Sequence, residues 1–169
     1  DEARQLTPLG KQLAQLPIDP RIARMILAAQ KENCLTEVLI IAAALSSQDP
    51  RDRPLAAQEA ADTAHRRFQD ERSDFLGFIK LWRFYEQALI HKKSSRKLAQ
   101  LCRDNFLSAL RMREWRDIHG QLAVMVKEMG IRPNEIEADY AQIHRALLTG
   151  LLGNIGFKSD SREYLGARG

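Results

Sequence analysis

The sequence lacks several features that would define its chemistry at once. It contains no G-x-x-x-x-G-K-[ST] phosphate loop and no G-x-G-x-x-G turn, so it offers no glycine-rich cradle for the phosphates of a nucleotide. No apolar run approaches the roughly 20 residues that a membrane helix needs, and no signal peptide opens the chain. We therefore expect a cytoplasmic protein with no membrane partner.

Thiol and metal chemistry have little support. The two cysteines, Cys34 and Cys102, form no paired motif and have no nearby histidine in the sequence, so a thiol nucleophile is not indicated. The four histidines lie more than 20 residues apart, without the short spacings typical of metal ligands. We therefore expect no catalytic residue and no metal ligand in this chain.

The composition is that of a globular protein with one unusual block of charge. Of the 169 residues, 44% are hydrophobic and 28% charged, which allows a sizeable core without disulfides. The net charge is 26 − 22 = +4, and residues 80–127 alone hold 11 basic and 4 acidic side chains, or +7. Residues 1–79 carry −2 and residues 128–169 carry −1. Such a block is either a binding surface for a polyanion or a solvated helical face.

Apolar spacing predicts helices almost throughout, so the expected fold class is all-α. Asp19-Pro20 has the cap and proline that begin a helix, and Gly130 stands where a glycine ends one. A strand is plausible from residue 163. Helices are expected from 8 to 16, from 20 onward, and over 35–45, 55–67, 75–91, 96–103, 106–129 and 140–154.

The longest predicted helix, over 106–129, has two distinct faces when residues are placed at 100° steps. The expected core face comprises Leu107, Ile118, Leu122, Met125 and Met129. The opposite stripe is basic with a small centre: Arg113, Arg116, Gly120, Ala123 and Lys127. Glycine costs a helix interior roughly 1 kcal/mol relative to alanine. Gly120 therefore indicates a close approach, either by a phosphate backbone or by another helix.

Arg111 and Glu114 are unusual because they are charged but fall on the expected core face. Since they are three residues apart, they can pair, and burying either alone would be costly. They could form a satisfied pair under a loop or line an internal channel.

Six segments, in order and at matching distances, resemble the C-terminal region of DEAH-box RNA helicases, closest to the bacterial HrpA type. Arg113 matches an arginine of that family, whereas Arg111 replaces a serine. The segments are LTPLG (6–10) with LPIDPR (16–21), ALS (44–46) with RP (53–54), Phe68 with SDFL (73–76) and Trp82, NFL (105–107) with RMREW (111–115), DIH (117–119) and QL (121–122), ALLTGLL (146–152), and EYLGAR (163–168).

The resemblance implies a helical bundle, the ratchet-like helicase-associated domain, at residues 32–155. The end of a winged-helix domain would precede it at 1–31, and the first strand of an oligonucleotide-binding (OB) barrel would follow at 156–169. It implies a fragment of an ATP-dependent RNA helicase that holds single-stranded RNA. The motor domains, which bind ATP and Mg²⁺, would lie elsewhere in the same polypeptide, and this part would hydrolyse no ATP itself.

The expected RNA-contacting residues combine the stripe with neighbouring cations. The expected partners of this chain are single-stranded RNA, the motor domains and the OB barrel. The alternative function is a protein-interaction module, in which the basic block docks an acidic partner or the motor domains without touching RNA. The candidate residues are Arg113, Arg116, Lys127, Gly120, Arg111, Lys92, Lys93 and Arg96.

Overall fold

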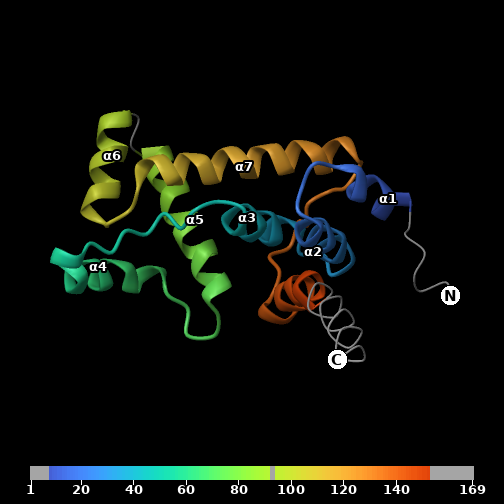
Figure 1. The fold of residues 1–169 in the computed structure, drawn as a ribbon, viewed down its shortest axis with the longest axis horizontal. Coiled ribbons are helices and arrows are strands. Elements are labelled where there is room, and N and C mark those ends of the chain that lie inside the picture. The colour runs from blue at the N-terminus through green and yellow to red at the C-terminus, as the bar shows by residue number, and fades with distance from the viewer. Residues whose placement is uncertain (1–7, 92–93, 153–169) are drawn as a thin grey trace, which may run out of the picture. The chain divides into compact units, whose positions relative to one another are not determined.

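A computed structural model describes residues 8–91 and 94–152 of the chain, apart from the side chains of residues 9 and 14. The described residues are helical with connecting loops, and they contain no strand, which confirms the all-α class. The strand expected from residue 163 lies outside them. The helices, labelled in Figure 1, are α1 (Pro8–Gln15), α2 (Pro20–Lys31), α3 (Leu35–Leu45), α4 (Gln58–His65), α5 (Asp74–His91), α6 (Ser95–Asp104) and α7 (Ala109–Glu128), with short 3-10 turns η2 (Leu55–Ala57) and η3 (Arg66–Phe68) and a further helix over 140–152.

The chain divides into two compact units, and the divisions fall within α3 and α7. The first unit comprises Asp1–Leu39 and Val124–Gly169, and the second comprises Ile40–Ala123. The domain boundaries expected at residues 31 and 155 stay predictions.

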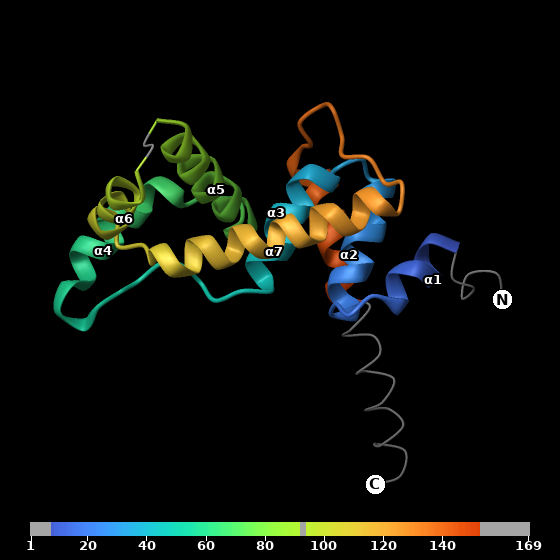
Figure 2. The ribbon, with the colours of Figure 1, turned by 90° about the horizontal axis from the view of Figure 1, so that it is seen from above.

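In the first unit, α2 begins as its cap signal predicts. The Asp19 carboxylate accepts a hydrogen bond from the Arg21 backbone N–H at 2.8 Å, which satisfies a free donor of the first turn. The expected apolar face of α2, which includes Met25 and Ile26, is buried. A loop over residues 131–139 follows α7 and projects before the helix at 140–152 (Figure 2).

In the second unit, aromatic side chains fill the space between α5 and α7. Trp115 is fully buried, and its indole N–H donates to the Ile40 carbonyl at 3.0 Å. Its ring meets that of Trp82 edge-on at 5.1 Å. Phe68 packs against Phe84 with ring centroids 5.0 Å apart. The contact of Trp115 with Trp82 holds α7 against α5, so the side chains on the flank of α7 have fixed neighbours.

Helix α7 differs from its prediction in its start and in its buried face. It begins at Ala109 because Phe106 takes a positive φ of 52° and Leu107 pairs with Arg51 in an isolated antiparallel bridge. The buried residues of α7 are Met112, Trp115, Leu122 and Val126. The expected face was therefore wrong in part: Leu122 is buried and Leu107 is buried from outside the helix, but Ile118, Met125 and Met129 are only half-buried. The end is as predicted, since Gly130 has φ 77°.

Candidate nucleic-acid interface

Arg113, Arg116 and Gly120 lie along one flank of α7 in the second unit, as the helical spacing predicts. Arg113 is exposed and, among the described residues, has no hydrogen bond or ion pair. Arg116 lies one turn further along the same flank and is 35% exposed. The two guanidinium groups therefore present positive charge from adjacent turns.

Arg116 is held in place by aromatic rings and one acid. Its guanidinium carbon lies 5.1 Å from the centre of the Trp82 ring and 6.0 Å from that of Tyr85, within the range of cation–π attraction. Its Nη1 is 3.9 Å from Glu86 Oε1. That nitrogen is buried and has no hydrogen-bond acceptor within the described part of the chain. The guanidinium is thus oriented by its neighbours, while 35% of the Arg116 side chain stays exposed.

Gly120 has open space beside it. A Cβ added at this position would lie more than 4 Å from every described atom outside the two neighbouring residues and the nearby backbone of α7 itself. The alternative in which another helix contacts Gly120 is therefore wrong among the described residues. The alternative in which a phosphate backbone approaches Gly120 stays a prediction.

The other candidate residues are not gathered at this flank. Lys127 is exposed on α7 but belongs to the first unit. Arg96 is exposed in the first turn of α6. Lys92 and Lys93 lie outside the described residues. Arg111 donates to the Asp49 carbonyl at 3.2 Å and pairs with Asp52 at 3.5 Å.

Of the two alternatives for Arg111 and Glu114, the pair buried under a loop is wrong. The Arg111 side chain is 38% exposed, and Glu114 is exposed. Glu114 lines an open hollow of about 610 Å³ together with Asp117 and the end of α3. Because the charged side chains of this hollow are acidic, it would repel a phosphate.

His119 lies beside Arg116 on α7. Its ring is 4.5 Å from that of Trp82. Burial and then the charge of Arg116 lower the pKa of His119 below its usual 6.5. The imidazole is therefore neutral at pH 7, and the positive charge of the flank comes from the arginines.

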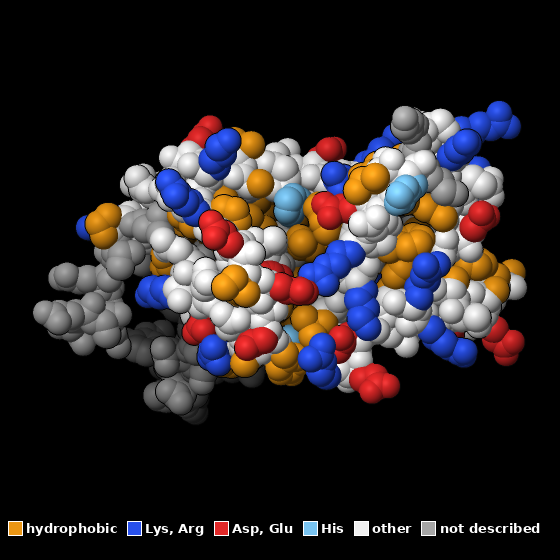
Figure 3. Space-filling view, turned by 180° about the vertical axis from the view of Figure 1, so that it is seen from behind, with side chains coloured by type: hydrophobic (Ala, Val, Ile, Leu, Met, Phe, Trp, Pro, Cys, Tyr) orange, Lys and Arg blue, Asp and Glu red, His pale blue; other side chains and the backbone are white. Residues whose placement is uncertain are grey.

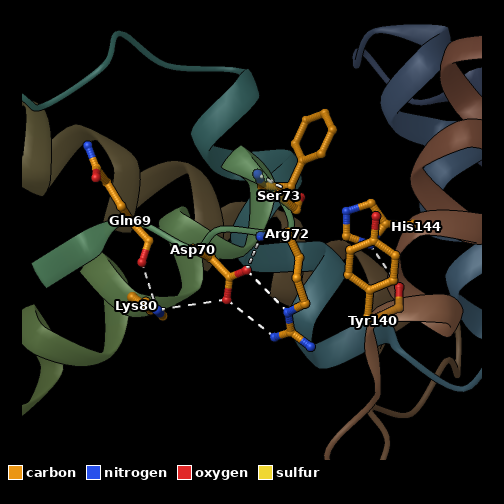
Figure 4. A network of polar contacts seen from close by, with 8 residues as sticks. Gln69, Asp70, Arg72, Ser73, Lys80, Tyr140 and His144 are labelled. Carbon is orange, nitrogen blue, oxygen red and sulfur yellow. Dashed lines mark hydrogen bonds and ion pairs between the residues drawn. The ribbon is translucent and has the colours of Figure 1, made fainter. Parts of the chain in front are cut away.

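Several other cations of the second unit are already engaged. Asp70 holds Arg72 at 3.2 Å and Lys80 at 3.8 Å, and Lys80 also donates to the Gln69 carbonyl at 2.7 Å (Figure 4). Figure 4 also draws a stacked pair from the first unit, Tyr140 and His144. On the face drawn in Figure 3, basic and acidic side chains are interspersed. Net charge alone therefore does not mark the interface.

Arg67 is a surface cation that sequence reasoning missed, because it lies before the basic block. Its guanidinium stands 4.4 Å from the centre of the Phe84 ring, and its Nη1 is 3.4 Å from Asn105 Oδ1. Its neighbour Arg66 is exposed. The adjacent arginines at 66 and 67 were a visible signal, although the aromatic support was not.

Both cysteines of the chain lie among the described residues and are buried. Burial raises the pKa of the Cys34 thiol to about 12 and also raises that of Cys102, so neither is a thiolate at neutral pH. Within the described ranges, no group of three or more His, Cys, Asp or Glu side chains could hold a metal ion. No helix in those ranges is long and apolar enough to span a bilayer.

This chain is similar to a known protein family and to several known proteins. Residues 19–78 match the family described as "Helicase associated domain (HA2), ratchet-like". Over 98% of its length the chain is 54% identical to the ATP-dependent RNA helicase HrpA of Escherichia coli (strain K12). Over 99% it is 50% identical to the HrpA homolog of Haemophilus influenzae. It covers 13% of each of these relatives. Over 92% it is 32% identical to the DExH-box ATP-dependent RNA helicase DExH1 of Arabidopsis thaliana, of which it covers 16%.

Proposed function

The chain belongs to the ratchet-like helicase-associated region of the DEAH-box RNA helicases, and we propose that it is the part of such an enzyme that holds single-stranded RNA. The observation that carries the proposal is the flank of α7, where Arg116 is oriented by Trp82 beside the open backbone of Gly120. Arg113 adds a second cation one turn away. This arrangement suits a phosphate backbone, which needs positive charge and room for close approach.

The contacts would be to phosphates rather than bases. A helicase must pass any sequence, and arginines that reach phosphates carry no sequence information directly. Arg96, an exposed cation of the same unit, would add positive charge, and Lys127 of the first unit is a separate candidate contact. The motor domains, which would hold ATP and Mg²⁺, would lie elsewhere in the cytoplasmic parent enzyme and would move the strand that this region holds.

The docking alternative places the same cations against an acidic protein surface. It draws support from the cations that already pair with acids in the second unit, such as Arg111 with Asp52. Affinity for mixed-sequence single-stranded RNA separates the two functions. If the α7 cations dock on an acidic protein surface instead, the RNA affinity should not depend on them.

The test removes charge from α7 within the full-length helicase. We expect the triple variant Arg113→Ala, Arg116→Ala, Lys127→Ala to bind single-stranded RNA more weakly at every sequence. Each lost contact should lower the slope of log affinity against log salt by about 0.7. The matched control removes three exposed cations outside the basic block: Lys11→Ala, Arg24→Ala, Lys31→Ala. An unchanged affinity and salt slope in the α7 variant would refute the proposal.

A further inference from the structure

Tyr85 of α5 is almost completely buried, yet its hydroxyl has no hydrogen bond among the described residues. Only 4% of the residue is exposed, and the hydroxyl of a buried tyrosine usually has a hydrogen-bond partner. In the described part of the chain, the side-chain atom that is both fully enclosed and without a partner is Arg116 Nη1, not the Tyr85 oxygen. The Tyr85 hydroxyl therefore reaches the surface, where a ligand can meet it.

Two cations of α7 lie close to this hydroxyl. The Arg116 guanidinium carbon is 6.0 Å from the centre of the Tyr85 ring, and Arg113 lies one turn earlier on the same helix. Burial raises the pKa of Tyr85 above its usual 10, as does Cys102 to a lesser degree, and the charges of Arg116 and Arg113 lower it in part. Both guanidinium groups are thus near enough to act on the hydroxyl.

At pH 7 the hydroxyl keeps its proton, so it is a neutral donor beside positive charge. An acceptor that carries negative charge would satisfy the hydroxyl and both arginines at once. A phosphate has such oxygens, and tyrosine is among the side chains that bind the phosphates of nucleic acids. A hydrogen bond to an ionised acceptor is stronger than one between neutral groups.

We propose that the Tyr85 hydroxyl donates a hydrogen bond to the RNA phosphate that Arg113 and Arg116 attract, so that α5 and α7 together form one phosphate site. This inference rests on the proposed function, and it adds a residue of a second helix to the α7 flank. Because the donor is neutral, it contributes affinity without adding charge.

Glu86 is the acid that pairs with Arg116, and it is the main competitor of a phosphate there. Its Oε1 is 3.9 Å from Arg116 Nη1, and the Glu86 side chain is 47% exposed. An exposed ion pair this long contributes little, so a phosphate can take its place. Removing the competing charge with Glu86→Gln should therefore raise the affinity for RNA.

The test is Tyr85→Phe in the full-length helicase, with mixed-sequence single-stranded RNA as the probe. Losing one hydrogen bond to a charged group should lower the affinity about ten-fold at every salt concentration. The slope of log affinity against log salt should stay unchanged, because a neutral hydroxyl releases no counterion. The thermal midpoint should also stay unchanged, since the ring remains and the hydroxyl has no partner within the described chain. The matched control, Tyr140→Phe, removes a hydroxyl from the other unit and should leave all three measurements unchanged.

Three results would overturn the inference. Tyr85→Phe that binds RNA as tightly as the parent shows that the hydroxyl makes no contact. A salt slope lowered as much as in Arg116→Ala shows that the hydroxyl only positions that arginine. A lower thermal midpoint that accounts for the lost affinity shows a structural role. The proposed function has its own readout: if Arg113→Ala and Arg116→Ala weaken binding while Tyr85→Phe does not, only this inference fails.

Discussion

Arg113 and Arg116 lie on one flank of α7 but would reach a phosphate at different cost. Arg116 rests on two rings, with its guanidinium carbon 5.1 Å from the centre of Trp82, so part of its rotamer freedom is already lost in the free protein. Arg113 has no hydrogen bond or ion pair among the described residues and must be ordered on binding. Immobilising such a side chain costs about 0.5–1.5 kcal/mol. Of the two proposed contacts, Arg116 is therefore the better preorganised one.

Arg111 provides a residue-scale prediction. Because its side chain is 38% exposed and that of its partner Asp52 is 47% exposed, we expect Arg111→Ala to lower the free energy of unfolding by no more than about 1 kcal/mol. The reference is Trp115→Ala, which empties a fully buried site and should cost about 3–5 kcal/mol. Urea unfolding of both variants measures the difference. A cost for Arg111→Ala that approaches that of Trp115→Ala would contradict the exposed geometry.

At the scale of the element, the sequence predicted most helices because their ends carry local signals. Asp19-Pro20 and Gly130 marked a start and an end that the structure confirms. The start of α7 also carries a local signal, which the prediction overlooked: Ser108 directly precedes the helix, and its hydroxyl accepts from the Arg111 backbone N–H at 3.2 Å. The turn before Ser108 depends on more distant partners, namely the Asp52 N–H, which donates to the Phe106 carbonyl at 2.8 Å, and the bridge from Arg51 to Leu107. These partners are more than 50 residues apart, and periodicity within one segment cannot reveal them.

The error at the start of α7 carried over to its faces. Including Leu107 shifted the expected apolar sector away from Met112 and Trp115, the two fully buried residues. Arg111 and Glu114 then fell on the supposed core face. The flank that carries Arg113, Arg116 and Gly120 could still be predicted, because its members share spacing within one helix whatever that helix packs against.

Replacing each of two helical glycines by alanine should change the free energy of unfolding in opposite directions. A Cβ at Gly120 would meet nothing within 4 Å, whereas one at Gly77 in α5 would lie 2.7 Å from the Phe68 carbonyl oxygen. We expect Gly120→Ala to raise the free energy of unfolding by up to about 1 kcal/mol through helix propensity. Gly77→Ala should lower it by about 1–3 kcal/mol through overpacking. Thermal unfolding of both variants is the measurement.

The same Gly120→Ala variant also reports on RNA. If a phosphate backbone approaches Gly120, RNA affinity should fall although stability rises. Equal affinity in the variant and the parent would show that the open space beside Gly120 is not part of the interface.

At the scale of the whole molecule, the sequence located the excess positive charge but not which of its cations pair with acids. Residues 80–127 carry +7. Lys80 pairs with Asp70, Arg111 with Asp52 and Arg116 with Glu86. These acids lie 10 to 59 positions away along the chain, so only the fold determines which cations they engage. The aromatic support of Arg116 was equally invisible, since Trp82 belongs to a different helix.

Phosphoryl transfer needs a cradle for the phosphates, a bound metal ion and a group that positions the nucleophile. The sequence has no phosphate loop, and the described residues contain no cluster able to hold a metal. We therefore expect the 169-residue chain to release no phosphate from ATP above a matched blank, with or without single-stranded RNA. The measurement is colorimetric phosphate release with a full-length relative as the positive control. Turnover that persists through repeated purification and falls when this chain's own residues are changed would show that the region hydrolyses ATP itself.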